Sequence, residues 1–277
     1  MRSHRPTDDV TVLAHAEEIP GLGCLPVNAF VLHADQPLLV DTGMPRCREQ
    51  FLDLLWSAVD PGDLHYVWIT HPDRDHTGAL AQVLEAAPQA RLVTTFMGYG
   101  IMSIEHDIPL DRVRLVNPGE QLDLGDRMLA GFRPPLYDSP VTTGFRDGRT
   151  GTVFTSDCFG APLASADLAI GDDARDVPAA DLVGAMQLWA VADSPWVQMV
   201  DRARYADSLR GVGEAGLPLV LSTHLPPARD LGDRLLDAIA AAPDVPLPPE
   251  PDQAALDAML ASFAPAQRAS EDVSVAP

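Results

Sequence analysis

The segment "HPDRDHTG", residues 71–78, places two histidines and two aspartates within six positions, directly after an apolar run. His71 and Asp73 lie two apart in an extended segment, so both side chains can reach one metal ion. Asp75 and His76 lie on the turn into a helix and point toward a second position. Two interpretations stay open at this point, a site for two metals and a helix-capping turn, because Asp and Thr are favoured at helix starts.

Three further strand-like runs end in a residue that can bind a metal. Asp41 follows "LLV", Asp157 follows "TVFTS" and His224 follows "LVLST". Because binding sites in sheet proteins gather where strands end, we expect these side chains to join the 71–76 segment. The three cysteines have no paired spacing, so any metal is expected to be bound by His and carboxylate.

The composition excludes several classes of function. A formal net charge of -21 argues against nucleic-acid and anionic membrane partners, since such binding depends on neutralising negative charge. All 19 basic residues are Arg, which excludes Schiff-base and P-loop chemistry that needs Lys. The N-terminal sequence is unlike a signal peptide, and no segment has the roughly 20 apolar residues of a membrane span. We therefore expect a cytoplasmic protein that does not bind membranes.

The elements that must position these residues are short strands and amphipathic helices, bounded by Gly, Pro or Asp. Predicted strands cover residues 10–13, 28–33, 38–40, 66–69, 91–94, 112–116, 121–124, 128–132, 141–145, 152–155 and 217–221. Predicted helices start near 45 and cover 78–87, 96–106, 179–211 with a break near Pro195, and 231–241. Sheet followed by sheet, without strict strand–helix alternation, indicates a two-sheet α/β domain.

The expected domain limits follow from composition. Residues 1–9 are polar and are predicted to be disordered, and 10–242 form the domain. The Pro/Ala-rich tail, 243–277, reads as a linker with one peripheral helix at 252–263, and its last dozen residues are predicted to be disordered.

The order of "NAFVL", "LLVDTG", "THPDRDHTG", "TVFTSDCFGA" and "STHLPPA" resembles the metallo-β-lactamase superfamily over about residues 10–242. The resemblance implies an αββα sandwich with a metal site at one edge. The common superfamily motif is His-x-His-x-Asp-His, whereas this chain has Asp73 at the second histidine. A carboxylate at that position and the sequence "SDCFGA" resemble the flavodiiron branch and its oxygen-binding diiron relatives.

Transferred by position, the resemblance implies a set of metal ligands: His71 and Asp73 on the first metal, Asp75, His76 and His224 on the second, and Asp157 bridging both. A further histidine of the family has no counterpart in residues 133–145, where the spacing places Asp138. Three alternatives stay open: Asp138 is an oxygen ligand, it is only a turn residue, or the first metal is under-coordinated or absent. We expect Asp41 to fix a ligand by hydrogen bonds and Tyr137, beside Asp138, to lie behind the ligands.

An oxygen-rich ligand set without Cys suits iron best, with zinc or manganese as alternatives. Flavodiiron enzymes carry a fused flavodoxin domain, and too few residues follow 242 for one, so we expect no flavin in this chain. Reduction of a bound substrate would then need a separate electron-transfer partner.

Three functions remain open, and the first two use the same residues. The preferred one is a diiron-type protein that binds or reduces O₂, NO or a peroxide. The second is a hydrolase of an ester, thioester, lactone or phosphodiester, in which the metal lowers the pKa of water and Asp75 is a base or ligand. The third is a binding module without catalysis. The superfamily alone favours hydrolysis, whereas Asp73 and "DCFGA" favour the redox branch.

Overall fold

The structure is a computed structural model that describes residues 1–247, 249 and 251–263, and the chain divides into two units. The first unit, Met1–Pro246, contains both sheets. The second, Leu247–Pro277, contains helix α9 (Gln253–Phe263) in its described part. All the residues implicated in metal binding belong to the first unit.

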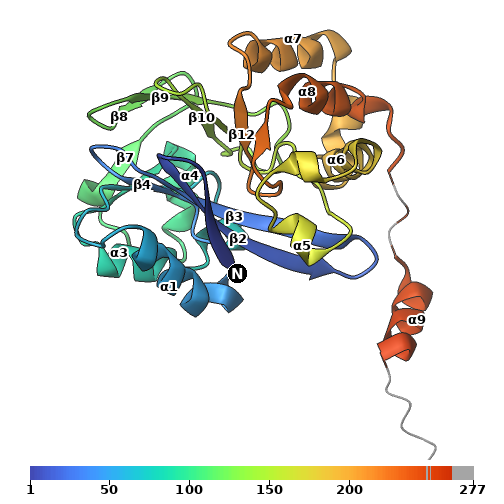
Figure 1. Cartoon of the computed structure of the whole chain (residues 1–277), viewed down its shortest axis with the longest axis horizontal. Coiled ribbons are helices and arrows are strands. Elements are labelled where there is room, and N and C mark those ends of the chain that lie inside the picture. The colour runs from blue at the N-terminus through green and yellow to red at the C-terminus, as the bar shows by residue number, and fades with distance from the viewer. Residues whose placement is uncertain (248, 250, 264–277) are drawn as a thin grey trace, which may run out of the picture. The chain divides into compact units, whose positions relative to one another are not determined.

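The first unit is built on two sheets (Figure 1). One has seven strands in chain order: β1 (Arg2–Thr7), β2 (Val10–Ile19), β3 (Gly23–Leu32), β4 (Leu38–Val40), β5 (Tyr66–Trp68), β6 (Arg91–Thr94) and β7 (Val113–Leu115). Pairing is antiparallel from β1 to β4 and parallel from β4 to β7.

The second sheet has the order β13-β12-β11-β10-β9-β8. Its strands are β8 (Gln121–Asp123), β9 (Met128–Phe132), β10 (Gly144–Asp147), β11 (Val153–Phe154), β12 (Leu219–Leu221) and β13 (Ala228–Arg229). β11 and β12 are parallel and the other pairs are antiparallel. In both sheets, parallel neighbours therefore end at one edge and deliver their following loops to the same place.

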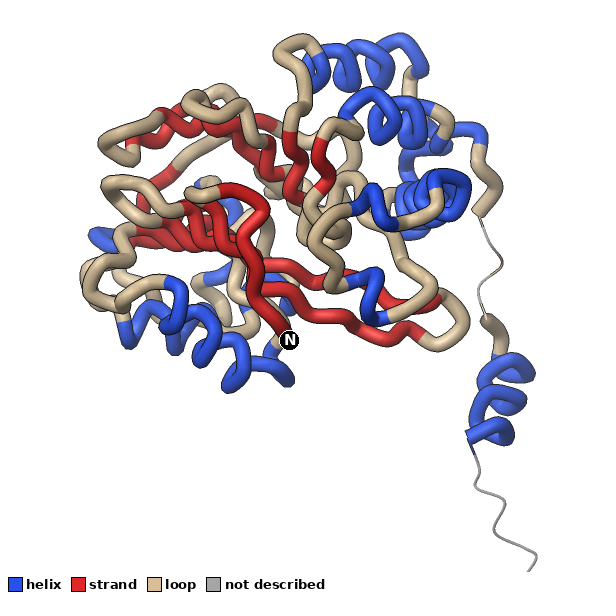
Figure 2. Tube along the Cα trace, in the orientation of Figure 1, coloured by secondary structure: helices blue, strands red, loops and turns tan. Residues whose placement is uncertain are grey.

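Helices cover the outer face of each sheet (Figures 1 and 2). The first sheet is covered by α1 (Arg48–Ala58), α3 (Leu80–Ala86) and α4 (Phe96–Met102), and the second by α6 (Ala179–Asp193), α7 (Arg202–Gly213) and α8 (Gly232–Ala240). Two short helices, α2 (Arg74–Thr77) and α5 (Ala166–Ala169), and five 3₁₀ turns at 45–47, 110–112, 174–176, 195–199 and 242–244 complete the described elements. The predicted αββα sandwich is confirmed.

Alternation along the strands explains why both faces of each sheet are covered. In β4, Leu38 and Val40 point between the sheets, whereas Leu39 points toward the helices. Trp68 of β5 is fully buried in the inter-sheet layer, with its ring 4.6 Å from that of Phe145. Each such side chain contributes about 1.5–3 kcal/mol of hydrophobic free energy, which holds the two sheets together.

The prediction that residues 1–9 are disordered is wrong. Arg2–Thr7 form β1, which pairs with β2 in a register that places His4 opposite Val12. The alternating burial of β1 is that of an edge strand with one face toward solvent, so polar side chains do not prevent pairing. The domain consequently begins at the first residues of the chain.

Other boundaries differ from the sequence predictions by a few residues. The helix predicted at 96–106 ends at Met102, and the strand predicted at 141–145 begins at Gly144. The helix predicted at 252–263 corresponds to α9. The last dozen residues, predicted to be disordered, lie outside the described residues.

Candidate metal centre

The candidate centre lies where β4, β5, β11 and β12 end, and backbone hydrogen bonds join the loops of the two sheets there. Thr143 N–H donates to the Thr70 carbonyl at 2.9 Å, which connects the β10 and β5 regions. Thr223 N–H donates to the Ser156 carbonyl at 2.9 Å, and Asn28 N–H donates to the Thr223 carbonyl at 2.8 Å. The side chains that follow these strands are therefore held by backbone from both sheets.

Four predicted ligands form a first cluster: His71, Asp73, Asp138 and Asp157. His71 Nε2 lies 3.5 Å from Asp157 Oδ2, 3.6 Å from Asp138 Oδ1 and 3.9 Å from Asp73 Oδ2. The His71 side chain is fully buried, whereas that of Asp73 is 56% exposed. Asp138 therefore lies close enough to His71 and Asp73 to share a metal ion with them.

The second cluster consists of Asp75, His76, His224 and Asp157. His76 Nε2 lies 3.2 Å from Asp157 Oδ1 and 3.5 Å from Asp75 Oδ2. His224 Nε2 lies 3.3 and 3.4 Å from the same two oxygens. The two oxygens of Asp157 thus face different clusters, which is the arrangement of a carboxylate that bridges two cations.

Unpartnered atoms test whether these residues fit metal ions. His71 Nε2, His76 Nε2 and Asp157 Oδ1 are buried and have no hydrogen-bond partner within the protein. Buried polar atoms are nearly always satisfied, so three such atoms in two adjoining clusters indicate a place for bound cations. His76 Nε2 and Asp157 Oδ1 are 3.2 Å apart yet are not aligned for a hydrogen bond. The residues fit the two metals that the resemblance implies.

The outer nitrogens of two histidines are fixed by strong acceptors. His76 Nδ1 lies 2.8 Å from Asp41 Oδ2, and His224 Nδ1 lies 2.7 Å from the Pro26 carbonyl oxygen. Neither acceptor can donate, so each Nδ1 carries the proton. In the neutral imidazole that binds a metal, the Nε2 lone pair of both rings then points into the second cluster.

The proton on His71 follows from a chain of hydroxyl groups. Asp41 can only accept, so Thr70 Oγ1 donates to Asp41 Oδ2 at 2.9 Å, and Ser156 Oγ donates to Thr70 Oγ1 at 2.9 Å. Because the Ser156 proton is used, its oxygen accepts from His71 Nδ1 at 3.2 Å. His71 Nε2 is thereby also left as a lone pair directed at the first cluster.

Backbone strain and close packing accompany this arrangement. Asp41 and Ser156 have positive φ angles of 57° and 53°, a conformation that costs a non-glycine residue roughly 1–2 kcal/mol. A Cβ on Gly160 would lie 2.4 Å from Trp189 Nε1 and 2.9 Å from His224 Cβ. Gly160 therefore leaves the room that Trp189 and His224 need, and Asp41 and Ser156 keep their strained backbone beside the ligands.

Electrostatics in the second cluster favour positive charge. Burial opposes protonation of His76, but Asp75, Asp41 and Asp157 outweigh it and hold the pKa of His76 well above its usual value. Burial likewise opposes protonation of His224, yet Asp157 and Asp75 raise its pKa to about 9. Protons on these rings compensate the carboxylates when no cation does, so a metal ion and these protons compete for the same place.

The site favours the ionised form of one carboxylate, that of Asp157, and disfavours the ionised form of two others. Burial alone would raise the pKa of Asp157, but His71 and the other two histidines hold that pKa well below its usual range. Burial and the charge of Asp157 raise the pKa of Asp138. Burial, followed by repulsion from Asp157 and Asp138, raises the pKa of Asp193 to about 7.

Several residues of the site were missed from the sequence. Asp193 ends α6 and lies beside Asp138 and Asp157, although it is 36 positions from the nearer of them. Ser156 and the Pro26 carbonyl orient histidines, and Trp189 Nε1 donates to the Asp157 carbonyl at 3.1 Å. The segment around Asp193 ends a helix before Pro195, and nothing in that pattern points to a metal site.

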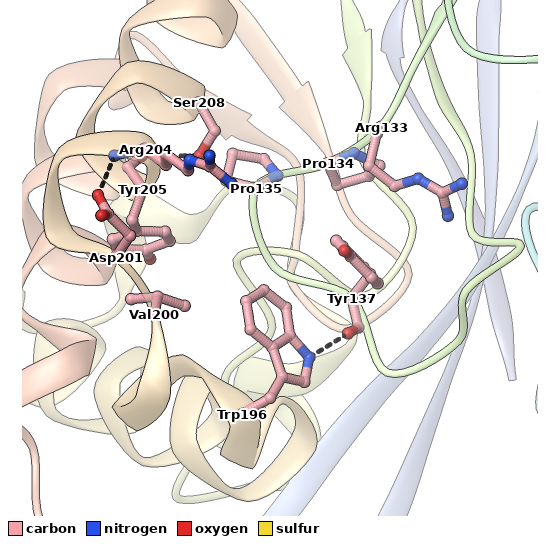
Figure 3. A pocket seen from close by; sticks show the side chains of 10 residues that line it. All are labelled: Arg133, Pro134, Pro135, Tyr137, Trp196, Val200, Asp201, Arg204, Tyr205 and Ser208. Carbon is pink, nitrogen blue, oxygen red and sulfur yellow. Dashed lines mark hydrogen bonds between the residues drawn. The ribbon is translucent and has the colours of Figure 1, made fainter.

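Tyr137, predicted to lie behind the ligands, lines a neighbouring pocket of about 400 Å³ (Figure 3). Its ring packs 4.9 Å from that of Trp196, and Trp196 Nε1 donates to the Tyr137 carbonyl at 2.8 Å. Arg133 lies over the same ring, 5.1 Å from its centre. Tyr137 therefore faces this pocket, whereas the adjacent Asp138 faces His71 of the first cluster.

Family membership follows from a direct comparison. A model of the metallo-beta-lactamase superfamily matches residues 22–181, which is more than half of the chain. The chain belongs to this superfamily. The matched range contains both clusters except His224, so the superfamily assignment and the geometry describe the same region.

Solved structures of similar fold are flavodiiron proteins. Rubredoxin oxygen:oxidoreductase from Desulfovibrio gigas superposes with a TM-score of 0.76 and 18% identity, over 88% of this chain and 62% of that one. The flavodiiron protein from Giardia intestinalis gives 0.75 and 16%, over 88% and 59%. These TM-scores establish the shared fold, and the predicted resemblance to the flavodiiron branch is confirmed.

Curated relatives carry related names. Putative diflavin flavoprotein A 1 of Thermosynechococcus vestitus is 31% identical over 141 residues, 50% of this chain and 24% of its own length. Anaerobic nitric oxide reductase flavorubredoxin of Salmonella typhi is 25% identical over 147 residues, 53% and 31%. This chain therefore spans about a quarter to a third of these relatives. Among the described residues, no helix has the length and apolar character needed to cross a bilayer.

Proposed function

We propose that this chain holds two metal ions, preferably iron, and binds or reduces O₂, NO or a peroxide with electrons from a separate donor. The observation that carries the proposal is the Asp157 carboxylate, whose two oxygens face two different clusters of unpartnered ligand atoms. Relatives named as diflavin flavoproteins and as a nitric oxide reductase support the redox branch.

The ligand chemistry supports iron or manganese over zinc. Four carboxylates and three histidines supply hard oxygen and imidazole donors, with no thiolate among them. Two bound iron ions would hold a diatomic molecule and exchange electrons with it. The protein's part is to fix the donors, since Asp41 and the hydroxyl chain orient the rings before any ion arrives.

A metal-dependent hydrolase is the second candidate, supported by membership of the superfamily. In that reaction Asp75 would act as general base. However, Asp75 Oδ2 lies within 3.5 Å of the Nε2 atoms of both His76 and His224, which favours a role as ligand over that of a free base. The same geometry fits the redox proposal without any additional base.

Metal analysis of protein purified without chelator and without added metal separates the candidates. Under the redox proposal we expect about two irons per chain, an absorption band that changes on exposure to O₂, and consumption of O₂ or NO with a chemical reductant. Zinc without such a band, combined with ester or thioester hydrolysis, would replace the redox proposal with the hydrolase. A chain that binds no metal under any loading condition would contradict both.

A further inference from the structure

Asp193 brings an additional carboxylate to the first cluster from the far side of the fold. One oxygen of Asp193 lies within 4.8 Å of carboxylate oxygens of Asp138 and Asp157. Asp193 is the last residue of α6, and its Oδ2 accepts a hydrogen bond from Ser194 Oγ at 3.2 Å. The three oxygens are close enough to share one cation after small side-chain rotations, because metal–oxygen bonds are about 2.0–2.2 Å long.

A fully buried nitrogen lone pair points at two of these three carboxylates, those of Asp138 and Asp157. His71 Nε2 has no hydrogen-bond partner and lies 3.6 Å from Asp138 Oδ1 and 3.5 Å from Asp157 Oδ2. Because the Asp41–Thr70–Ser156 hydrogen-bond chain keeps the His71 proton on Nδ1, the Nε2 lone pair is free to bind a cation. The grouping is therefore more than a set of acidic residues, because an independent ligand atom is aimed at it.

The position of Asp193 is unfavourable unless a cation is present. The C-terminal end of a helix carries partial negative charge, which repels a carboxylate attached there. α6 has 15 residues, long enough for this effect, and the half-buried Asp193 also faces two further carboxylates. A divalent cation among these groups would offset the repulsion of Asp193 by the helix end, by Asp138 and by Asp157.

We propose that Asp193 is a ligand of the first metal, and that it makes this position selective for Mn²⁺ or Fe²⁺ over Zn²⁺. The first position then has one nitrogen, from His71, and carboxylates from Asp73, Asp138, Asp157 and Asp193. The second position has two imidazoles and is the better zinc site. The inference rests on the two-metal site of the proposed function but not on its redox chemistry.

The test is titration of the metal-stripped full-length chain with Mn²⁺ alone, following free Mn²⁺ by electron paramagnetic resonance, and then with Zn²⁺. Wild type is expected to bind two Mn²⁺. Asp193→Asn, which keeps the shape of the side chain, is expected to weaken one of the two Mn²⁺ equivalents about tenfold or more. Asp181→Asn, an exposed position in the first turn of the same helix, is the matched control and should leave both unchanged.

A second variant tests the selectivity in the opposite direction. Asp193→His adds a nitrogen donor, so the first position should bind Zn²⁺ about tenfold more tightly than in wild type and Mn²⁺ more weakly. If Asp193→Asn keeps both Mn²⁺ equivalents at wild-type affinity, or if Asp193→His gains no Zn²⁺ affinity, the inference is wrong while the two-metal proposal stands. If wild type itself binds no metal, the proposed function fails instead.

Discussion

Two groups of carboxylates, each gathered around buried side chains, occupy opposite ends of the strands, and only one group has all its hydrogen bonds made within the protein. At the end away from the metal centre, Arg127 is 2% exposed at its side chain and donates to Asp9 at 2.6 Å, Asp126 at 2.9 Å and Asp147 at 3.0 Å. At the other end, the two metal clusters retain unpartnered nitrogen and oxygen atoms.

The difference shows how charge is compensated in each place. A guanidinium supplies five donors in a fixed plane, so one Arg satisfies three carboxylates and joins the β1–β2, β8–β9 and β10–β11 turns. At the metal centre the Nε2 atoms of His71 and His76 face carboxylate oxygens without hydrogen-bond alignment. Carboxylates whose hydrogen bonds are all made by the protein indicate a structural role. Buried ligand atoms that are left without a partner indicate a binding site.

The largest effect is expected from removing the shared carboxylate. Asp157→Ala takes away the oxygens that face both clusters, so metal content should fall from about two ions per chain to none. Mass spectrometry of the purified variant measures this. Asp126→Ala, the same change in the Arg127 group, should keep its metals. A variant lacking Asp157 that retains two ions would contradict the proposed centre.

Removing the guanidinium should affect stability and leave metal binding unchanged. Arg127→Met leaves Asp9 and the buried Asp147 without their cation, whereas Asp126 keeps Arg149. Loss of one partner of a buried ion pair costs about 3–5 kcal/mol. Urea unfolding of the metal-stripped proteins measures the loss. A decrease in unfolding free energy of less than about 1 kcal/mol would contradict a structural role for the Arg127 group.

A smaller effect on metal affinity is expected from substituting Asp41, which orients the ligand His76. Asp41→Asn places an N–H₂ group against either the Thr70 amide or the His76 ring, both of which need an acceptor. Metal affinity should fall about 10- to 100-fold, the usual cost of losing such a partner. Competition with a chelator of known affinity provides the measurement, and unchanged affinity would remove Asp41 from the site.

The smallest effect concerns acid stability. The hydrogen bond from Arg127 lowers the pKa of Asp126 to about 2 against burial, so the folded pKa lies below the unfolded value of about 3.9. The stability that Asp126 contributes is complete above pH 4 and is lost as the pH falls toward 2. The difference in unfolding free energy between wild type and Asp126→Asn should therefore shrink between pH 4 and 2. A constant difference would argue against the depressed pKa.

The sequence by itself was sufficient for the local parts of the site. The spacing of His71, Asp73, Asp75 and His76 after a buried strand depends on neighbours along the chain, and β4 and β6 have the predicted bounds. Local signals also predicted a two-sheet α/β domain, whereas the αββα arrangement of its layers was implied only by the resemblance to the metallo-β-lactamase superfamily. β1 was missed because an edge strand of polar residues gives no apolar alternation to detect.

The tertiary structure decided which groups meet across the two sheets. Asp157 reaches both clusters, and the Pro26 carbonyl reaches His224 from 198 positions away. Both contacts depend on the pairing of β11 with β12 and on the hydrogen bond from Asn28 of β3, in the other sheet, to the Thr223 carbonyl. Asp193 joins them through the packing of α6 on the second sheet. Spacing along the chain therefore indicates which residues can be ligands. Which of them share a metal ion is decided by distances across the sandwich, because contacts between residues far apart in the chain leave no pattern in the local sequence.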